Sequence, residues 1–275
     1  ISGGLRADCV PVAQRAALKI LKISLPRLVP SLHQIEITSR CNLRCSYCPS
    51  PQIVKGADGY RPSLDISEQH FSRALDHVDY YARAGTQTII NLNGIGESTL
   101  HPKFVDFLAE IRARLGKIPL ILATNGVGYD EDLVARIAAH APIAVWVSLH
   151  RPEKAGRAVE WFRKHDLLAG VSTDPSLNAN DWAGQVDWFH SNHTVLPCAW
   201  IRQGLVMAAS DGRLLSCCID AKGQGVVGHV DDAPGSHRVG PYALCGDCYQ
   251  EVGVEGYDQR AGVSPQRLLK IGARP

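Results

Sequence analysis

The stretch HQIEITSRCNLRCSYCPS, residues 33–50, joins the two features that decide the fold. Residues 33–38 form a short apolar run containing β-branched side chains, which is typical of a buried strand. Cys41, Cys45 and Cys48 follow directly, separated by three and then by two residues. Three cysteines this close together predict a metal centre with one ligand fewer than a closed tetrahedral site has.

The composition is that of an ordinary soluble globular protein. Of the 275 residues, 45% are hydrophobic and 20% are charged, which is enough apolar material for a sizeable core. The net charge of +2 and the lack of a run of Lys or Arg disfavour duplex nucleic acid as a partner, but not a nucleotide. We find neither an apolar run long enough to span a membrane nor a signal peptide. We therefore expect a cytoplasmic protein with no membrane partner.

Short apolar runs alternate with helical patterns, which predicts βαβ units and a parallel sheet. The runs lie at residues 33–38, 86–93, 118–124, 143–148, 167–173 and 194–201. The helical patterns lie at about residues 65–84, 102–115, 130–140, 153–165 and 180–190. Six strands are fewer than the eight of a closed barrel, so we expect an α/β fold with a partial (β/α)6 TIM-like barrel. A flatter doubly wound sheet is the alternative, and both place the site at the carboxyl ends of the strands.

The two ends of the chain depart from this alternation. Residues 10–24 are basic and amphipathic, so we expect residues 1–30 to form an N-terminal helical extension packed on the core, residues 31–202. A membrane-surface helix is the alternative. Beyond the core, two short apolar runs flank a Ser-Asp-Gly turn signal at 210–212. We expect residues 203–275 to form a small β-hairpin and helix domain that bound metal helps to stabilise.

The chemistry of three cysteines favours iron and sulfur over zinc. A closed zinc site has four ligands, but the loop from Asn42 to Leu64 contains no fourth Cys or His. Cysteine thiolates hold iron–sulfur clusters, and three thiolates on a four-iron cube leave one iron open to a substrate or cofactor. We therefore expect a [4Fe–4S] cluster, with a zinc site that borrows a distant ligand as the alternative.

These residues resemble the radical S-adenosylmethionine (SAM) enzymes. Cys41, Cys45 and Cys48 match the CxxxCxxC signature of that family, and Tyr47 fills its usual aromatic position. The resemblance implies that the open iron chelates the amino and carboxylate groups of SAM. It further implies reductive cleavage of SAM to methionine and a 5′-deoxyadenosyl radical, which removes a hydrogen atom from substrate. An electron donor of the flavodoxin or ferredoxin type is implied as well.

Three further stretches resemble motifs of this family. NGIGE, residues 93–97, resembles the GGE-type motif that contacts the SAM ammonium, and LATNG (122–126) and VSLH (147–150) follow the next two expected strands. The resemblance implies cofactor contacts for Tyr47, Asn93, Gly94, Gly96, Glu97, Asn125 and Ser148. A carboxylate suits an ammonium, glycines allow close approach of the backbone, and a hydroxyl can bond a ribose. Plain turns are the alternative for NGIGE and for Asn125 before Gly126.

A second group of cysteines lies nearer the C-terminus. Cys198 is followed by thirteen residues, Gly212, four residues and Cys217, and Cys245 and Cys248 form a CxxC. This resembles the opening of the SPASM domain of radical SAM enzymes, and the cysteine count resembles its shortened form, the twitch domain. The resemblance implies one auxiliary [4Fe–4S] cluster held by all four cysteines, with Cys198 contributed from the end of the core.

Cys218 competes with Cys217 for one ligand position. The spacing selects Cys217, and neighbours in a strand point in opposite directions, so we expect Cys218 to be a buried or spare thiol. Cys9 is expected to be an ordinary cysteine. A zinc ribbon is the alternative for the second group.

The whole arrangement most resembles radical SAM dehydrogenases of the 2-deoxy-scyllo-inosamine type, which are compact, carry a twitch domain and oxidise an alcohol to a ketone. The resemblance implies a two-electron oxidation of a small polar substrate with the auxiliary cluster as electron acceptor. Peptide maturation by crosslinking, modification of a nucleoside or sugar nucleotide, and a non-enzymatic zinc-binding scaffold are the alternatives.

Groups that touch the substrate are expected at strand ends and in the loops above them. His150 and Arg202 are candidates for catalytic groups, and Arg151, Asn93 and Gln52 for substrate contacts. A solvated or structural role is the alternative for each, and the sequence indicates no acid/base pair.

Overall fold

The structure, a computed structural model, describes residues 30–173, 182–187, 196–248 and 250–251. Its strands are β1 (Ser31–Ile35), β2 (Ile90–Asn91), β3 (Leu120–Thr124), β4 (Ile143–Ser148), β5 (Leu168–Ser172), β6 (Leu196–Pro197), β7 (Leu205–Ala208), β8 (Arg213–Leu215), β9 (Val226–His229) and β10 (Gln250–Glu251). Its helices are α2 (Ser50–Val54), α3 (Glu68–Arg83), α4 (Phe104–Leu115), α5 (Glu131–Ala138), α6 (Pro152–Lys164), α7 (Ala199–Gln203), α8 (Ala243–Asp247) and the 3-10 turn η2 (Ser98–Leu100). The helix expected at residues 10–24, and Cys9, lie outside the described residues.

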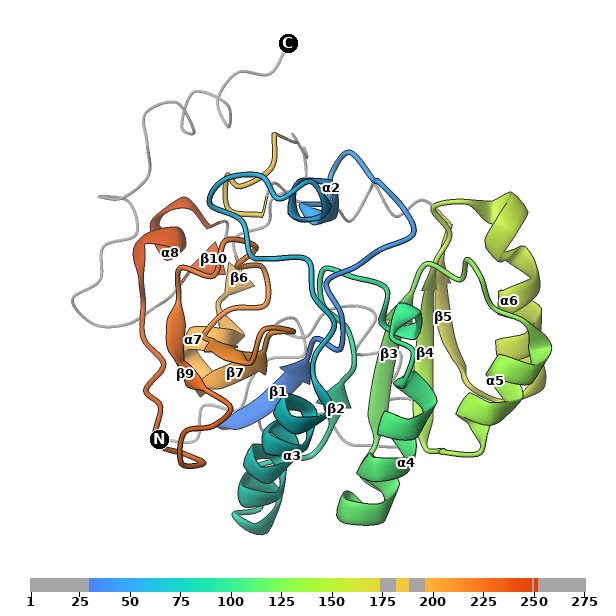
Figure 1. Cartoon of the computed structure of the whole chain (residues 1–275), viewed down its shortest axis with the longest axis horizontal. Helices are drawn as coiled ribbons and strands as arrows, with labels where there is room; N and C mark the ends of the chain where they lie inside the picture. The colour runs from blue at the N-terminus through green and yellow to red at the C-terminus, as the bar shows by residue number, and fades with distance from the viewer. Residues whose placement is uncertain (1–29, 174–181, 188–195, 249, 252–275) are drawn as a thin grey trace.

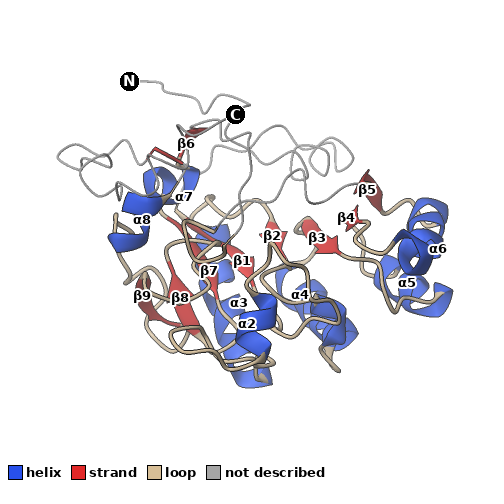
Figure 2. Cartoon of the chain, turned by 90° about the horizontal axis from the view of Figure 1, so that it is seen from above, coloured by secondary structure: helices blue, strands red, loops and turns tan. Residues whose placement is uncertain are grey.

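One sheet organises the described part of the chain. Its eight strands follow the order β5-β4-β3-β2-β1-β7-β8-β9. The strands from β5 to β7 run parallel, and β8 and β9 extend the sheet antiparallel. Figure 2 shows an open row of strands with α3, α4, α5 and α6 along one side. Because these helices share one side, the fold is the predicted partial TIM-like barrel, and the doubly wound alternative is not adopted.

The sixth parallel strand differs from the one predicted at residues 194–201. In that region β6 pairs with β10 in a separate two-stranded sheet, and α7 begins two residues later. The place beside β1 belongs instead to β7, with Ser31 opposite Leu205. A short apolar run is compatible with a strand or with a buried helix turn, so periodicity alone cannot locate the strand.

The hairpin predicted around residues 210–212 is present between β7 and β8, which pair antiparallel. The helix predicted at residues 180–190 is absent over the described segment 182–187, which consists of turns. Trp182 and Ala183 have left-handed φ angles of 53° and 56° there, which a right-handed helix excludes. The division of the chain at residues 30 and 202 stays a prediction.

The helices bury an apolar stripe against the sheet. In α3 the stripe has the expected helical spacing, with Phe71, Leu75 and Val78 buried. Ser67 caps the helix by accepting a hydrogen bond from the backbone N–H of His70 at 3.0 Å. Phe71 stacks on Phe107 of α4 with ring centroids 3.9 Å apart, which joins the two helices over the core. Among the described helices, none combines the length and apolar character needed to cross a membrane.

Candidate active site

Cys41, Cys45 and Cys48 lie in the loop after β1, at the carboxyl end of the parallel strands (Figure 1). None forms a disulfide, and all are partly exposed. Burial, reinforced by the neighbouring Cys41 and Cys45 thiols, raises the pKa of Cys48 to about 12. Burial likewise raises the pKa of Cys41 and Cys45. Such thiols become thiolates when a bound cation stabilises the charge.

Asn125 links this loop to the end of β3. Its side-chain N–H donates to the Asn42 side-chain oxygen at 2.7 Å, and the same nitrogen lies 3.8 Å from the Cys41 sulfur. Asn42 in turn donates to the carbonyl of Val127 at 3.0 Å. The left-handed turn residue is Gly126, with φ of 72°. The role of Asn42 was missed from the sequence, although its place between two cysteines is a signal.

His150 contacts the cysteine loop from the end of β4. Its Nδ1 is hydrogen-bonded to the Tyr47 hydroxyl, and the two rings stack with centroids 5.8 Å apart. The same nitrogen lies 3.5 Å from the Cys45 sulfur. Burial lowers the pKa of His150, which favours the neutral ring. Trp182 holds Tyr47 from the other side by donating to its carbonyl at 3.0 Å.

The carboxylate of Glu97 is buried and joins the loop after β2 to the end of β3. It accepts a hydrogen bond from the backbone N–H of Asn125 at 2.8 Å. It also accepts from the hydroxyls of Thr124, Thr99 and Tyr129, at 2.7, 3.2 and 3.4 Å. Burial raises the pKa of Glu97, and these hydrogen bonds oppose that rise. Both carboxylate oxygens are therefore engaged within the protein.

Gly94 and Gly96 allow the NGIGE loop to lie directly against the segment that follows β1. A Cβ at Gly94 would lie 2.4 Å from Cγ of Glu36. A Cβ at Gly96 would lie 2.2 Å from the carbonyl oxygen of Thr38 and 2.5 Å from that of Arg40. The two glycines thus allow the loop to lie close to the Glu36 side chain and to backbone carbonyls of the same chain.

The remaining predicted residues differ in what they offer. The side-chain oxygen of Asn93 is buried and has no hydrogen-bond partner among the described atoms. Ser148 is half-buried at the end of β4. Arg151 and Gln52 are exposed. The side chain of Arg202, in α7, lies outside what the structure describes.

A buried ion pair that sequence reasoning missed lies beneath the cysteine loop. Arg61 donates to both oxygens of Glu36, at 2.7 and 3.2 Å, and both side chains are at most 1% exposed. Glu36 also accepts from the backbone N–H of Ile95 at 2.9 Å, and from the N–H and hydroxyl of Ser210 at 3.3 and 3.1 Å. The backbone N–H of Arg61 donates to the carbonyl of Ala221. The pair therefore joins the first cysteine loop, the NGIGE loop and the hairpin. Its signal in the sequence is an acid within the apolar run of residues 33–38.

The second group of cysteines lies in apolar surroundings. Cys198 and Cys245 are 6% and 7% exposed and pack with Ile201 and Trp200. Burial, with the neighbouring Cys217 and Cys245, raises the pKa of Cys198 to about 11. Three of the four predicted ligands thus lie close enough to repel one another as thiolates.

Cys217 and Cys218 have different neighbours. A hydrogen bond with Cys218, together with burial, raises the pKa of Cys217 well above its ordinary value. Cys218 packs against the small cluster of Met207, Ala209 and Leu215. Cys248 is half-buried, and its backbone N–H donates to the carbonyl of Cys245 at 3.3 Å.

The chain is similar in sequence to a known superfamily and to several of its members. The Radical SAM superfamily matches residues 35–197, more than half of the chain. A tungsten-containing aldehyde ferredoxin oxidoreductase cofactor-modifying protein of Pyrococcus furiosus is 31% identical over 140 residues, covering 51% of this chain and 35% of that protein. A GTP 3′,8-cyclase of Geobacter sulfurreducens is 35% identical over 103 residues, covering 36% and 28%. The matched segments are thus about a third of the length of these relatives.

Solved structures share the fold at low identity. The crystal structure of BtrN in complex with AdoMet and 2-DOIA aligns with a TM-score of 0.61 and 16% identity, covering 75% of this chain and 80% of that one. Native anSMEcpe with bound AdoMet aligns with a TM-score of 0.52 and 16% identity, covering 75% and 79%. With the superfamily match across the strands and the cysteine loop, the chain belongs to the radical SAM superfamily, whose members bind a [4Fe–4S] cluster and SAM.

Proposed function

We propose that this chain is a radical SAM oxidoreductase that oxidises a small polar substrate by two electrons. One observation carries the proposal: three thiols share one loop at the carboxyl ends of the strands, with Cys41 and Cys45 near enough to raise the pKa of Cys48, and this loop contains no fourth cysteine or histidine. The partly exposed thiols and the surrounding polar side chains suit a cluster with one open iron. When bound there, the cluster and SAM together supply a carbon radical able to take a hydrogen atom from substrate.

The protein groups around the trio suggest how SAM is held. The carboxylate oxygens of Glu97 are engaged by four donors, so its role is to position the NGIGE loop. The unpartnered oxygen of Asn93 is the better acceptor for the SAM ammonium. Ser148 lies at the carboxyl end of β4, where its hydroxyl suits a ribose. Asn125 positions the cysteine loop through Asn42.

We infer that Cys198, Cys217, Cys245 and Cys248 hold an auxiliary [4Fe–4S] cluster, as in a twitch domain. Cys198 and Cys245 are buried in a small apolar cluster of side chains, which suits an iron–sulfur cluster that is closed to ligands. Such a cluster supplies an electron acceptor when bound. It would match the stoichiometry of an alcohol oxidation, in which the substrate loses one hydrogen atom, one proton and one further electron. A flavodoxin or ferredoxin is the electron donor that we propose for the first site.

Three alternatives each have one observation in their favour. A peptide substrate is compatible with the fold, since anSMEcpe was crystallised with a Cp18Cys peptide. A nucleotide substrate would accord with the GTP 3′,8-cyclase relatives. A zinc site is favoured by the position of His150, whose Nδ1 is 3.5 Å from the Cys45 sulfur and could provide a fourth ligand.

Anaerobic reconstitution with iron and sulfide tests the proposal. We expect the protein to bind iron and sulfide and, with SAM and a reductant, to form 5′-deoxyadenosine that acquires deuterium from labelled substrate. The Cys218→Ala variant is the matched control and should behave like the unaltered protein. Stoichiometric zinc without iron would contradict the enzyme, and transfer of methyl groups from SAM to product would contradict the oxidation.

A further inference from the structure

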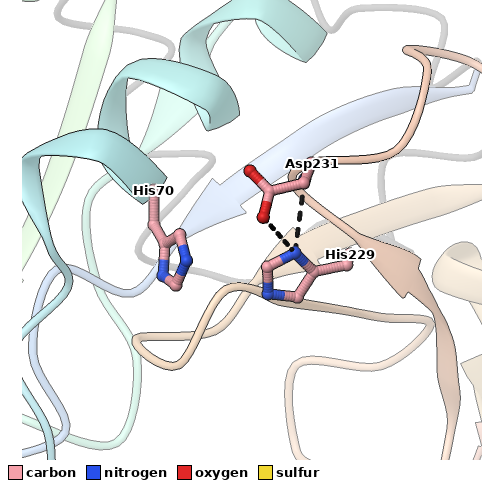
Figure 3. A group of neighbouring side chains, drawn as sticks. All are labelled: His70, His229 and Asp231. Carbon is pink, nitrogen blue, oxygen red and sulfur yellow. Dashed lines mark hydrogen bonds and ion pairs between the residues drawn. The ribbon is translucent and has the colours of Figure 1, made fainter.

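A group of metal-binding side chains lies outside both cysteine sets, where the first turn of α3 meets the end of β9. His70, His229 and Asp231 each place one ligand atom within 4.8 Å of the others. Figure 3 shows His70 extending from the helix toward the ring of His229, while the Asp231 carboxylate faces the same ring. We propose that these three residues bind a divalent metal of the zinc class.

The three ligand atoms lie nearly close enough together to bind one metal ion. The imidazoles of His70 and His229 lie edge to face, with centroids 5.0 Å apart and planes at 85°. One oxygen of Asp231 lies 3.1 Å from Nδ1 of His229. Two imidazoles and one carboxylate are a donor set that zinc uses, with bonds of about 2.0–2.2 Å and one position left for water. Ligand atoms of a tetrahedral site are therefore about 3.3 Å apart. Rotation of the half-buried histidines and the exposed aspartate can close the remaining gap.

The turn of the hairpin provides the room in which the two histidines meet. Gly212 has a left-handed φ of 87°. A Cβ on this residue would lie 2.5 Å from Nε2 of His229 and 2.9 Å from Nδ1 of His70. Any side chain at position 212 would push the imidazoles apart. The glycine between Cys198 and Cys217 is therefore required by the histidine pair as well as by the turn.

The charges around the site favour a cation. The carboxylate of Asp232 accepts the backbone N–H of His229 at 2.6 Å, so a second acid lies beside this residue. One cation competes: Nε of Arg73 is 4.0 Å from the second oxygen of Asp231. The side chain of Arg73 is 56% exposed and can turn into water when a metal takes its place.

A metal here would join segments that are far apart in the chain. His70 belongs to α3, and His229 ends β9, the outermost strand of the sheet on the hairpin side. A ligand that binds the folded state and not the unfolded chain stabilises the folded state. The metal would therefore hold β9, which pairs with β8 of the hairpin, against α3. The strand β8 leads to Cys217.

The test uses the reconstituted holoenzyme, in which iron occupies the cysteines. The protein is dialysed anaerobically against Zn²⁺, and zinc, iron and sulfide are then quantified. Zinc K-edge X-ray absorption identifies the neighbours of zinc without interference from iron. We expect one zinc per chain with only nitrogen and oxygen neighbours, at about 2.0–2.2 Å. We also expect a higher melting temperature with zinc than without it.

Three variants separate a site from a chance contact. Asp231→Asn alters an exposed side chain, so it should fold normally and weaken zinc binding at least about tenfold, the smallest loss expected when a metal-site partner is removed. His70→Gln and His229→Gln should abolish it. His140→Gln, at the half-buried histidine after α5, is the matched control and should bind zinc normally.

Three results would overturn the inference. They are a failure to bind zinc during dialysis, a sulfur neighbour at about 2.3 Å, and equal zinc binding by His70→Gln and the unaltered protein. In those cases His229 and Asp231 form only an ion pair, and His70 only packs against the His229 ring. None of these readings depends on SAM cleavage, so the proposed function and the zinc site can fail separately.

Discussion

The two groups of cysteines differ in what surrounds them more than in their sulfur chemistry. The first group is partly exposed, and its neighbours are the polar side chains of Asn125, Tyr47 and His150. In the second group Cys198 and Cys245 are almost fully buried among apolar side chains. Access and polar neighbours suit a centre that exchanges a ligand, and apolar enclosure suits a closed one. The surroundings therefore point to the same division of roles as the counts of three and four.

The two groups share one property that bears on the metal sites that we propose for them. Burial raises the pKa of Cys48 to about 12 and that of Cys198 to about 11. Without a cation these thiols stay protonated at neutral pH, and a metal displaces the protons when it binds. Removal of one group at a time tests whether the two sites have separate roles.

The largest effect is expected from Cys45→Ala. Removal of one of three ligands should release the first cluster, so bound iron should fall by about half if both clusters form. No 5′-deoxyadenosine should be detectable, because the loop from Asn42 to Leu64 contains no further cysteine to replace the thiolate. Iron analysis and chromatography of the SAM products measure both effects. Continued SAM cleavage at the normal rate would contradict the assignment of the first group.

Cys245→Ala should remove the second cluster and leave the first. Iron should again fall by about half, but SAM cleavage should persist while product formation drops strongly. Alanine fits this apolar site without an unpaired polar group, so the fold should survive. The ratio of product to 5′-deoxyadenosine is the measurement, with Cys218→Ala as the control. Loss of both 5′-deoxyadenosine and the oxidised product would mean that the second group is needed for the first site to form.

Arg61→Met tests the ion pair that joins the two regions. It leaves Glu36 buried and uncompensated, so the free energy of unfolding should fall by about 3–5 kcal/mol. Denaturant unfolding of the holoenzyme measures the loss. The control Arg83→Met breaks an exposed pair with Asp79 and should change the free energy by less than about 1 kcal/mol.

The double variant Glu36→Gln with Arg61→Met removes both charges and should recover part of the stability lost in Arg61→Met. Equal losses in the single and double variants would show that packing, and not the unpaired charge, accounts for the effect.

The smallest effect is expected from His150→Leu. Loss of a hydrogen-bonding neighbour of Cys45 should make the first cluster harder to reduce and slow SAM cleavage by about tenfold. Iron content should stay unchanged. A reductive titration followed by electron paramagnetic resonance (EPR) gives the potential, and Tyr47→Phe is the companion variant. Loss of the metal in His150→Leu would instead identify His150 as a ligand and favour the zinc alternative.

Much of the fold was predictable because buried parallel strands are short apolar runs. The runs around β1, β3, β4 and β5 were located to within a few residues, and the cysteine loop was placed at the strand ends by the general rule for such folds. The sixth strand was misplaced because the apolar runs on both sides of residue 202 fit the same pattern, and only tertiary pairing distinguishes them.

The site was less predictable because its contacts depend on segments that meet only after folding. Glu36 and Arg61 are separated by 25 residues, and His150 and Cys45 by 105. The glycines of NGIGE were interpreted as permitting a close ligand, whereas their nearest neighbours are Glu36 and backbone carbonyls. A motif therefore located the loop correctly but did not identify which of its atoms face a ligand.

The division into an open and a closed cluster is tested most directly by asking whether SAM binds one cluster and not the other. Cys245→Ala should contain only the first cluster, and Cys45→Ala only the second. EPR spectra of both reduced proteins, recorded with and without SAM, should show a shift of the signal in Cys245→Ala and no change in Cys45→Ala. A SAM-dependent shift in Cys45→Ala, or its absence in Cys245→Ala, would contradict the division into an open and a closed site.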